Sequence, residues 1–110
     1  ETDRGDEPLA DAAARELTEE TGYRAAALRL VACGAPSAGA VSEILHLYLA
    51  TGLEKVGPGG GDGDEQITVH TVPLDAAPAW LDKQSDAGKV VDLKVWAGLY
   101  FEQLSRQTGR

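Results

Sequence analysis

A helix that begins apolar and ends acidic constrains this sequence more than any other segment. Residues 8–21 follow a helical pattern, with a proline in the first turn, an alanine-rich middle and Gly22 as the stop signal. Within it, Glu16, Glu19 and Glu20 stand at positions i, i+3 and i+4, which share one side of a helix. Like charges at this spacing repel one another, and the C-terminal end of a helix disfavours anions. Selection for helix stability alone would avoid this arrangement.

Two interpretations of the acidic cluster follow from its chemistry. Carboxylate oxygens gathered this closely suit Mg²⁺ or Mn²⁺, which combine a few carboxylates with water and substrate phosphates. A solvated acidic helix face is the alternative, and the spacing alone does not decide between them.

The residues around the cluster follow a longer pattern. Glu7 precedes Arg15 by seven intervening residues, and Arg15-Glu16-Leu17-Thr18-Glu19-Glu20-Thr21-Gly22-Tyr23 continues from there. The Nudix pattern is Gly-x5-Glu-x7-Arg-Glu-U-x-Glu-Glu-x-Gly-U, where U is a bulky apolar residue. The chain matches eight of its nine fixed or typed positions, and the leading Gly falls on Glu1. The sequence therefore resembles the Nudix hydrolases.

The resemblance implies an α/β fold, a Nudix-type α/β/α sandwich around a mixed sheet. It also implies that Glu16 and Glu20 bind Mg²⁺ (or Mn²⁺) directly, and that Glu19 does so directly or through water. Arg15 and Glu7 are expected to pair and hold the loop against the helix, a supporting role for the metal ligands. Arg15 and Glu19 are also expected to take part in catalysis.

Downstream, the sequence looks like the ADP-ribose and nucleotide-sugar pyrophosphatase branch. Pro36 lies in a loop 13 residues after Tyr23, and Ser42-Glu43 opens a predicted strand. This similarity makes Pro36 and Glu43 candidate substrate-binding residues. A loop proline and a strand-edge glutamate with purely structural roles are the alternative.

A glycine-rich acidic loop, residues 57–64, comes before the next predicted strand, and its composition predicts a segment too polar and flexible to pack. In the branch that the chain resembles, an acidic residue of such a mobile loop acts as general base. Glu65 matches this place, and Asp62 or Asp64 could substitute for it. A solvated linker is the alternative interpretation.

The resemblance predicts hydrolysis of the pyrophosphate bond of a nucleoside diphosphate sugar, with ADP-ribose as the first expectation. GDP-mannose and UDP-glucose are the enzymatic alternatives. A non-catalytic, ADP-ribose-binding sensor is the alternative from another class. The intact glutamates and the lack of a basic appendage argue against the sensor.

The remaining elements are predicted from periodicity. We expect strands over residues 27–33, 44–50 and 67–72, a short helix over 74–83 and a last helix over 90–107. Asp92-Leu93-Lys94 resembles a structural segment that opens the last helix in relatives. Cys33 is predicted to be a small buried residue. His46 and His70 are predicted to be mid-strand residues rather than ligands.

Bulk properties set the remaining expectations. A chain of 110 residues, 43% hydrophobic and 25% charged, predicts one domain over residues 1–110. The net charge of −8, without a basic patch, argues against nucleic-acid and membrane partners. A single cysteine excludes an intramolecular disulfide and favours a cytoplasmic protein, which the resemblance predicts to be a homodimer. The charged start without Met predicts an N-terminally incomplete domain. The resemblance implies that the missing part holds the leading strands, which would form most of the base pocket.

Overall fold

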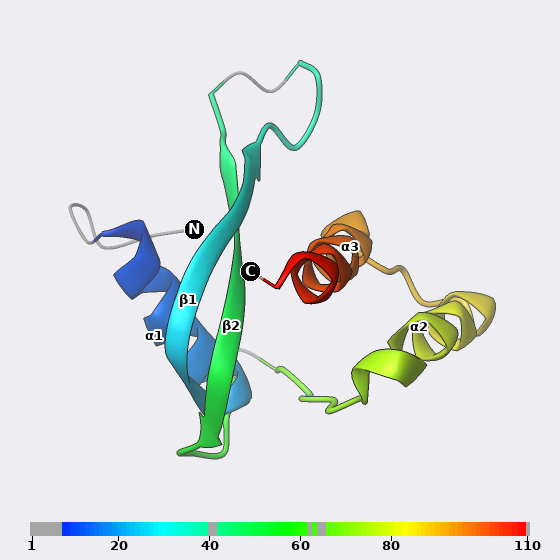
Figure 1. Ribbon diagram of the computed structural model, residues 1–110. Helices are drawn as coiled ribbons and strands as arrows, with labels where there is room; N and C mark the ends of the chain where they lie inside the picture. Colours follow the sequence, from blue (N-terminus) through cyan, green and yellow to red (C-terminus); the bar gives the residue numbers. More distant parts are fainter. Residues whose placement is uncertain (1–7, 40–41, 62, 64–65, 110) are drawn as a thin grey trace. The chain divides into compact units, whose positions relative to one another are not determined.

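The computed structural model describes residues 8–39, 42–61, 63 and 66–109, and the chain forms two compact units, Glu1–Val69 and His70–Arg110. Unit 1 contains one helix and two strands, and unit 2 contains the remaining helices. In chain order the elements are α1 (Leu9–Thr21), β1 (Tyr23–Gly34), β2 (Leu45–Lys55), the short 3-10 helix η1 (Leu74–Ala76), α2 (Ala77–Asp86) and α3 (Leu93–Thr108) (Figure 1).

Helix α1 confirms the helix predicted over residues 8–21. It ends at Gly22, which adopts a left-handed conformation (φ 80°) and donates its N–H to the carbonyl of Thr18 at 2.9 Å. This is a common helix ending, because glycine carries no Cβ that would clash in the left-handed region. Ala12, near the start of the helix, is 1% exposed.

Strands β1 and β2 form an antiparallel hairpin that begins one residue after Gly22. Tyr23 pairs with Lys55 at one end and Gly34 with Leu45 at the other, with a bulge between Leu30 and Ala32. Helix α1 packs against β1 and lies along the hairpin in Figure 1. The strands predicted over residues 27–33 and 44–50 are confirmed as parts of these longer strands.

The strand predicted over residues 67–72 is wrong, because residues 66–73 have no regular secondary structure. The predicted alternation is still visible in burial, since Ile67 and Val69 are half-buried and Thr68 and His70 are exposed. A strand also needs a neighbour for its backbone hydrogen bonds. Among the described residues, β1 and β2 pair only with each other.

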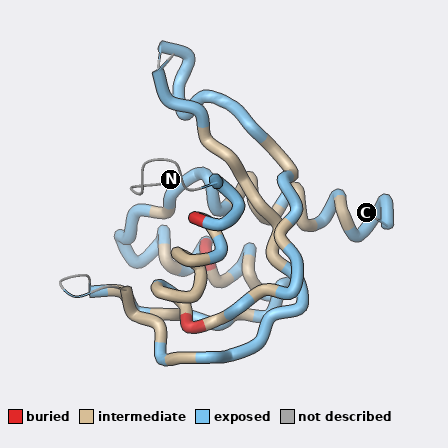
Figure 2. Tube along the Cα trace, turned by 90° about the vertical axis from the view of Figure 1, so that its left-hand side faces the viewer, coloured by how far each residue is buried: buried red, intermediate tan, exposed pale blue. Residues whose placement is uncertain are grey.

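Cys33 is exposed, so the prediction of a buried cysteine is wrong. It pairs across the hairpin with His46, one position from the end that is remote from Gly22. Burial is sparse elsewhere too. Ala12, Gly22 and Leu81 are the buried residues in the described part of the chain (Figure 2).

In unit 2, η1 and α2 confirm the short helix predicted over residues 74–83. Leu81 of α2 is 6% exposed, and the Trp80 ring lies 5.1 Å from that of His70. Helix α3 begins three residues later than predicted. The predicted start, Val90, is 98% exposed and lies outside the helix.

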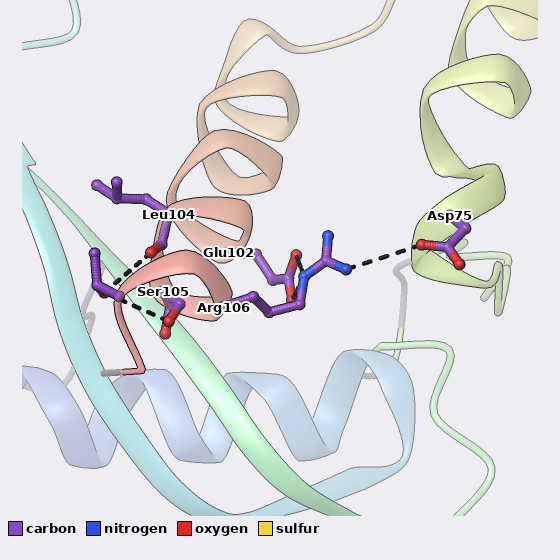
Figure 3. Close-up of polar contacts among 6 residues, drawn as sticks. Asp75, Glu102, Leu104, Ser105 and Arg106 are labelled. Carbon is purple, nitrogen blue, oxygen red and sulfur yellow. Dashed lines mark hydrogen bonds and ion pairs between the residues drawn. The ribbon is translucent and has the colours of Figure 1, made fainter.

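Arg106 of α3 forms ion pairs within unit 2. Its guanidinium lies 2.8 Å from Glu102, one turn earlier on the same helix, and 3.9 Å from Asp75 of η1 (Figure 3). The pair with Asp75, whose side chain is 96% exposed, contributes little to stability because water screens it. None of the helices in the described part of the chain combines the length and apolar character that crossing a membrane requires.

Asp92 determines where α3 begins. Its Oδ1 accepts a hydrogen bond from the Lys94 backbone N–H at 2.8 Å, and its Oδ2 accepts one from Lys94 Nζ at 2.7 Å. The side-chain hydrogen bond from Lys94, followed by the backbone one, lowers the pKa of Asp92 below its ordinary value of 3.8. The structural role predicted for the Asp92-Leu93-Lys94 segment is therefore confirmed.

We expect Asp92→Ala to lower the midpoint of thermal unfolding at neutral pH, because the first turn of α3 loses its cap. Asp92→Asn should retain the cap, since asparagine caps helices as well as aspartate does, but lose the ion pair with Lys94. A carboxyl whose folded-state pKa is lowered stabilises the fold above its unfolded-state pKa and loses this effect as the pH falls through the folded-state pKa. The advantage of Asp92 over Asn should therefore vanish in acid. Thermal melts followed by circular dichroism at neutral and at acidic pH test this. Equal midpoints of the wild-type protein and Asp92→Ala at neutral pH would contradict it.

Candidate functional site

The acidic cluster occupies the C-terminal part of α1, and we call residues 16–20 the glutamate turn. Glu16 and Glu19 are half-buried, and Glu20 is exposed. Arg15 Nη1 lies 3.3 Å from Glu19 Oε1, with 19% and 37% of the two side chains exposed. One described contact of Arg15 is therefore with Glu19, one helical turn along. The predicted partner, Glu7, lies outside the described residues.

The helix that carries the glutamate turn ends in a tightly packed backbone junction at Gly22. Its carbonyl accepts hydrogen bonds from Val56 N at 2.8 Å and from Gly57 N at 3.1 Å. A Cβ at this position would lie 2.2 Å from the carbonyl oxygen of Gly57. Gly22 is therefore required both by its positive φ and by the close approach of the chain that follows β2.

Residues 57–61, which we call the glycine loop, also bind the glutamate turn itself. Gly60 N donates to the carbonyl of Glu20 at 2.8 Å, and Gly61 N donates to that of Glu19 at 3.0 Å. These carbonyls belong to the last turn of a helix, where the backbone has no partner within the helix. The loop therefore satisfies backbone groups of two candidate metal ligands.

The prediction that this loop is too polar and flexible to pack is thus wrong for residues 57–61. The loop packs through its backbone, and glycine allows two backbones to approach closely. The only signal in the sequence was the run of glycines itself, which equally fits a flexible linker.

Hydroxyl groups add further links at the end of α1. Thr18 Oγ1 donates to the carbonyl of Tyr23 at 3.0 Å, and Thr21 Oγ1 donates to that of Leu17 at 2.6 Å. Thr21 Oγ1 also accepts from Tyr23 N at 3.2 Å. The glutamate turn is consequently tied to the first residue of β1 as well as to the glycine loop.

The other predicted site residues are not gathered at this turn. Pro36 and Glu43 are exposed and flank the connection between β1 and β2, at the far end of the hairpin from Gly22. A strand of 12 residues separates the two ends by roughly 35 Å. The candidate bases Asp62, Asp64 and Glu65 lie outside the described residues.

The donor set fits a hard divalent cation by residue type and spacing. Carboxylate oxygens are its preferred ligands, and side chains three and four positions apart on a helix have Cβ atoms about 5–6 Å apart. In the part of the chain that the structure describes, no three His, Cys, Asp or Glu side chains gather closely enough to hold an ion. The fit is therefore one of residue type and helical spacing, and the described carboxylates are not gathered around one point.

The model of the NUDIX domain family matches residues 2–93. This match includes α1, the hairpin, the glycine loop and α2. The chain therefore belongs to the Nudix family, and the predicted α/β Nudix fold class is confirmed.

Three curated proteins show which relatives share this domain. The chain is 33% identical over 103 residues to the methanol dehydrogenase activator of Bacillus methanolicus, covering 93% of this chain and 53% of the relative. Over 65 residues it is 43% identical to the CMP-5'-(N-acetyl-N-hydroxy-3-aminopropyl)phosphonate hydrolase of Streptomyces rubellomurinus, covering 59% and 31%. In an alignment of 65 residues it is 38% identical to the GDP-mannose pyrophosphatase of Cronobacter sakazakii, covering 57% of this chain and 34% of the relative. The chain spans about half the length of the first relative and about a third of the other two.

Proposed function

We propose that this protein is a metal-dependent Nudix pyrophosphatase that hydrolyses the pyrophosphate bond of a nucleoside diphosphate sugar. The products would be a nucleoside monophosphate and a sugar phosphate. The observation that carries this proposal is the intact glutamate turn, with Arg15, Glu16, Glu19 and Glu20 together on α1 and inside the matched family region. Two of the three relatives are named as enzymes that act on nucleotide compounds, which supports a hydrolase.

ADP-ribose is the substrate predicted by resemblance, and GDP-mannose and UDP-glucose are its alternatives. One relative is named a GDP-mannose pyrophosphatase, and this name supports the GDP-mannose alternative. Recognition of the base is a separate property from hydrolysis of the diphosphate. We therefore propose the reaction class first and treat the nucleotide as the variable to be tested.

In the proposed mechanism, Glu16 and Glu20 would hold a divalent cation, Mg²⁺ or Mn²⁺, together with Glu19. When bound, the cation supplies charge neutralisation of the diphosphate and lowers the pKa of a water molecule. Arg15 holds Glu19 in place at 3.3 Å and offsets part of the repulsion among the glutamates. Glu7 would support Arg15 from the preceding loop.

Glu65 is the proposed general base, with Asp62 and Asp64 as alternatives. It would take a proton from water as the water oxygen attacks one phosphorus atom. The bond from that phosphorus to the bridging oxygen, which lies opposite the attacking water, then breaks. The second phosphate leaves with the bridging oxygen. Glu65 follows Gly61 by four residues in the sequence, so the glycine loop leads from the glutamate turn toward the candidate base.

The remaining features of the proposal come from the composition, the single cysteine and the resemblance. Both units would belong to one domain over residues 1–110, since the matched region 2–93 extends across the boundary between them. The protein would act in the cytoplasm as a homodimer. For Pro36 and Glu43 to bind substrate at the same site, the second copy in that dimer would have to bring them there.

A regulatory role is the second candidate function. The relative that aligns with 93% of this chain is named an activator of methanol dehydrogenase. A non-catalytic sensor that binds ADP-ribose would fit such a role, although the intact glutamate turn favours catalysis.

A substrate panel on the full-length protein tests the proposed reaction. ADP-ribose, GDP-mannose and UDP-glucose are incubated with the protein and Mg²⁺, and the released nucleoside monophosphate is measured by chromatography. We expect release from at least one of them and no release after chelation of the metal. If the protein bound ADP-ribose but hydrolysed none of the compounds, the pyrophosphatase proposal would be wrong and the sensor would be supported instead.

Glu20→Gln tests the predicted cation ligand. Substitution of groups that only support a metal ligand costs roughly 10- to 100-fold, so loss of a direct ligand should lower turnover by at least about 100-fold. The fold should persist, because Glu20 is exposed and its backbone hydrogen bond with Gly60 does not involve the side chain. Glu54→Gln is the matched control, since Glu54 is an exposed glutamate of β2. Wild-type turnover in Glu20→Gln would remove this residue from the ligand set.

Glu65→Gln tests the general base separately from the cation. A general base contributes about 100- to 10,000-fold, and kcat should fall within this range. Mg²⁺ affinity, measured by calorimetry, should stay at the wild-type value, in contrast to Glu20→Gln. An unchanged kcat would move the role to Asp62 or Asp64, which the corresponding asparagine variants would identify.

A further inference from the structure

Backbone hydrogen bonds join the glycine loop to the end of α1. Gly60 and Gly61 bind the carbonyls of Glu20 and Glu19, while Val56 and Gly57 both bind that of Gly22. We propose that Gly59 is a positioning residue that allows this docking, and that docking of the loop is coupled to cation binding at the glutamate turn. This inference rests on the proposed function, because the cation is the one that the Nudix mechanism requires.

At Gly59 the loop lies so close to the end of the helix that a Cβ does not fit. Its φ is +70°, and a Cβ built there would lie 2.5 Å from the carbonyl carbon of Thr21 and 2.9 Å from the carbonyl oxygen of Glu20. The obstructing atoms are backbone, which cannot rotate away as a side chain would. Any other residue at this position must therefore lift the loop from the helix or displace the helix end.

Docking affects the glutamates because they belong to the last turn of α1. The final carbonyls of a helix lack partners within the helix, and helix ends fray for that reason. Fraying would remove the helical spacing that places Glu16, Glu19 and Glu20 on one side. The two loop amides bind the carbonyls of Glu19 and Glu20 themselves, so the docked loop holds the last turn in its helical form.

An ordered turn binds a cation more tightly than a frayed one, because it loses less conformational entropy when the cation binds. Coupling of this kind is reciprocal. If docking raises the affinity for the cation by some factor, then the cation must raise the docking equilibrium by the same factor. This requirement gives a measurement on the wild-type protein that needs no variant.

The first experiment measures amide hydrogen exchange of the full-length protein with and without saturating Mg²⁺. We expect exchange at Gly60 and Gly61 to slow by roughly 10- to 100-fold, the range typical of groups that support metal ligands. The Gly88 amide, which donates to the Ser85 carbonyl at 3.0 Å in unit 2, is the internal control and should not change. Unchanged exchange at Gly60 and Gly61 with Mg²⁺ bound would overturn the coupling.

The second experiment compares Gly59→Ala with Gly88→Ala by calorimetric titration with Mg²⁺. Both glycines have positive φ, +70° and +90°, but a Cβ at Gly88 meets nothing within 4 Å. The two variants therefore carry similar backbone strain, and only one of them obstructs docking. Mg²⁺ affinity should fall roughly 10- to 100-fold in Gly59→Ala and stay at the wild-type value in Gly88→Ala.

The outcomes separate this inference from the proposed function. Equal Mg²⁺ affinity in folded Gly59→Ala and Gly88→Ala would overturn the role of Gly59 and leave the pyrophosphatase intact. A wild-type protein that neither binds Mg²⁺ nor hydrolyses any nucleotide sugar would overturn both. If Gly59→Ala does not fold, the exchange measurement on the wild-type protein decides the coupling by itself.

Discussion

The left-handed turn at Gly22 joins every element of unit 1 within a few residues. Helix α1 ends there, β1 begins at the next residue, and the chain leaving β2 donates two hydrogen bonds to the Gly22 carbonyl. A side chain at Gly22 would collide with the backbone of Gly57. This junction therefore exists only because two backbone segments of the chain meet without a Cβ between them. The position of the glutamates relative to the hairpin and the glycine loop follows from that one contact.

The same junction accounts for an acidic cluster where a helix disfavours it. Each like-charge pair on the glutamate turn costs a few tenths of a kcal/mol, and the negative end of the helix dipole adds to this. The Arg15–Glu19 ion pair offsets part of the repulsion, and the loop amides satisfy carbonyls that would otherwise face water or go unpaired. Local instability at the turn is therefore compensated by contacts from the glycine loop, which is distant in sequence.

Elements encoded by neighbouring residues could be predicted, and elements that depend on distant partners could not. The apolar stripe and Gly22 define α1 locally, and the alternating residues 44–50 carry the signal for β2. Residues 67–72 show the same alternation, but a strand also requires a partner that no local pattern reveals. The helical pattern predicts a start for α3 at Val90, because Val90 and Val91 extend its apolar positions. The helix begins only at Leu93, because Asp92 provides the cap. Docking of the glycine loop was hard to predict because its described hydrogen bonds join backbone atoms, which every residue type carries.

This contrast also explains why the chemistry of the site is easier to infer than its substrate. The glutamates, Arg15 and Gly22 lie within one short segment, so their spacing identifies the Nudix family directly. Recognition of a base or sugar depends on side chains from separate segments, whose positions no single motif specifies. Relatives that share 33–43% identity with this chain are named for a phosphonate hydrolase, a sugar-nucleotide pyrophosphatase and an enzyme activator. One fold can serve several ligands, because a fold does not by itself determine function and the side chains that recognise a ligand can differ from one relative to the next.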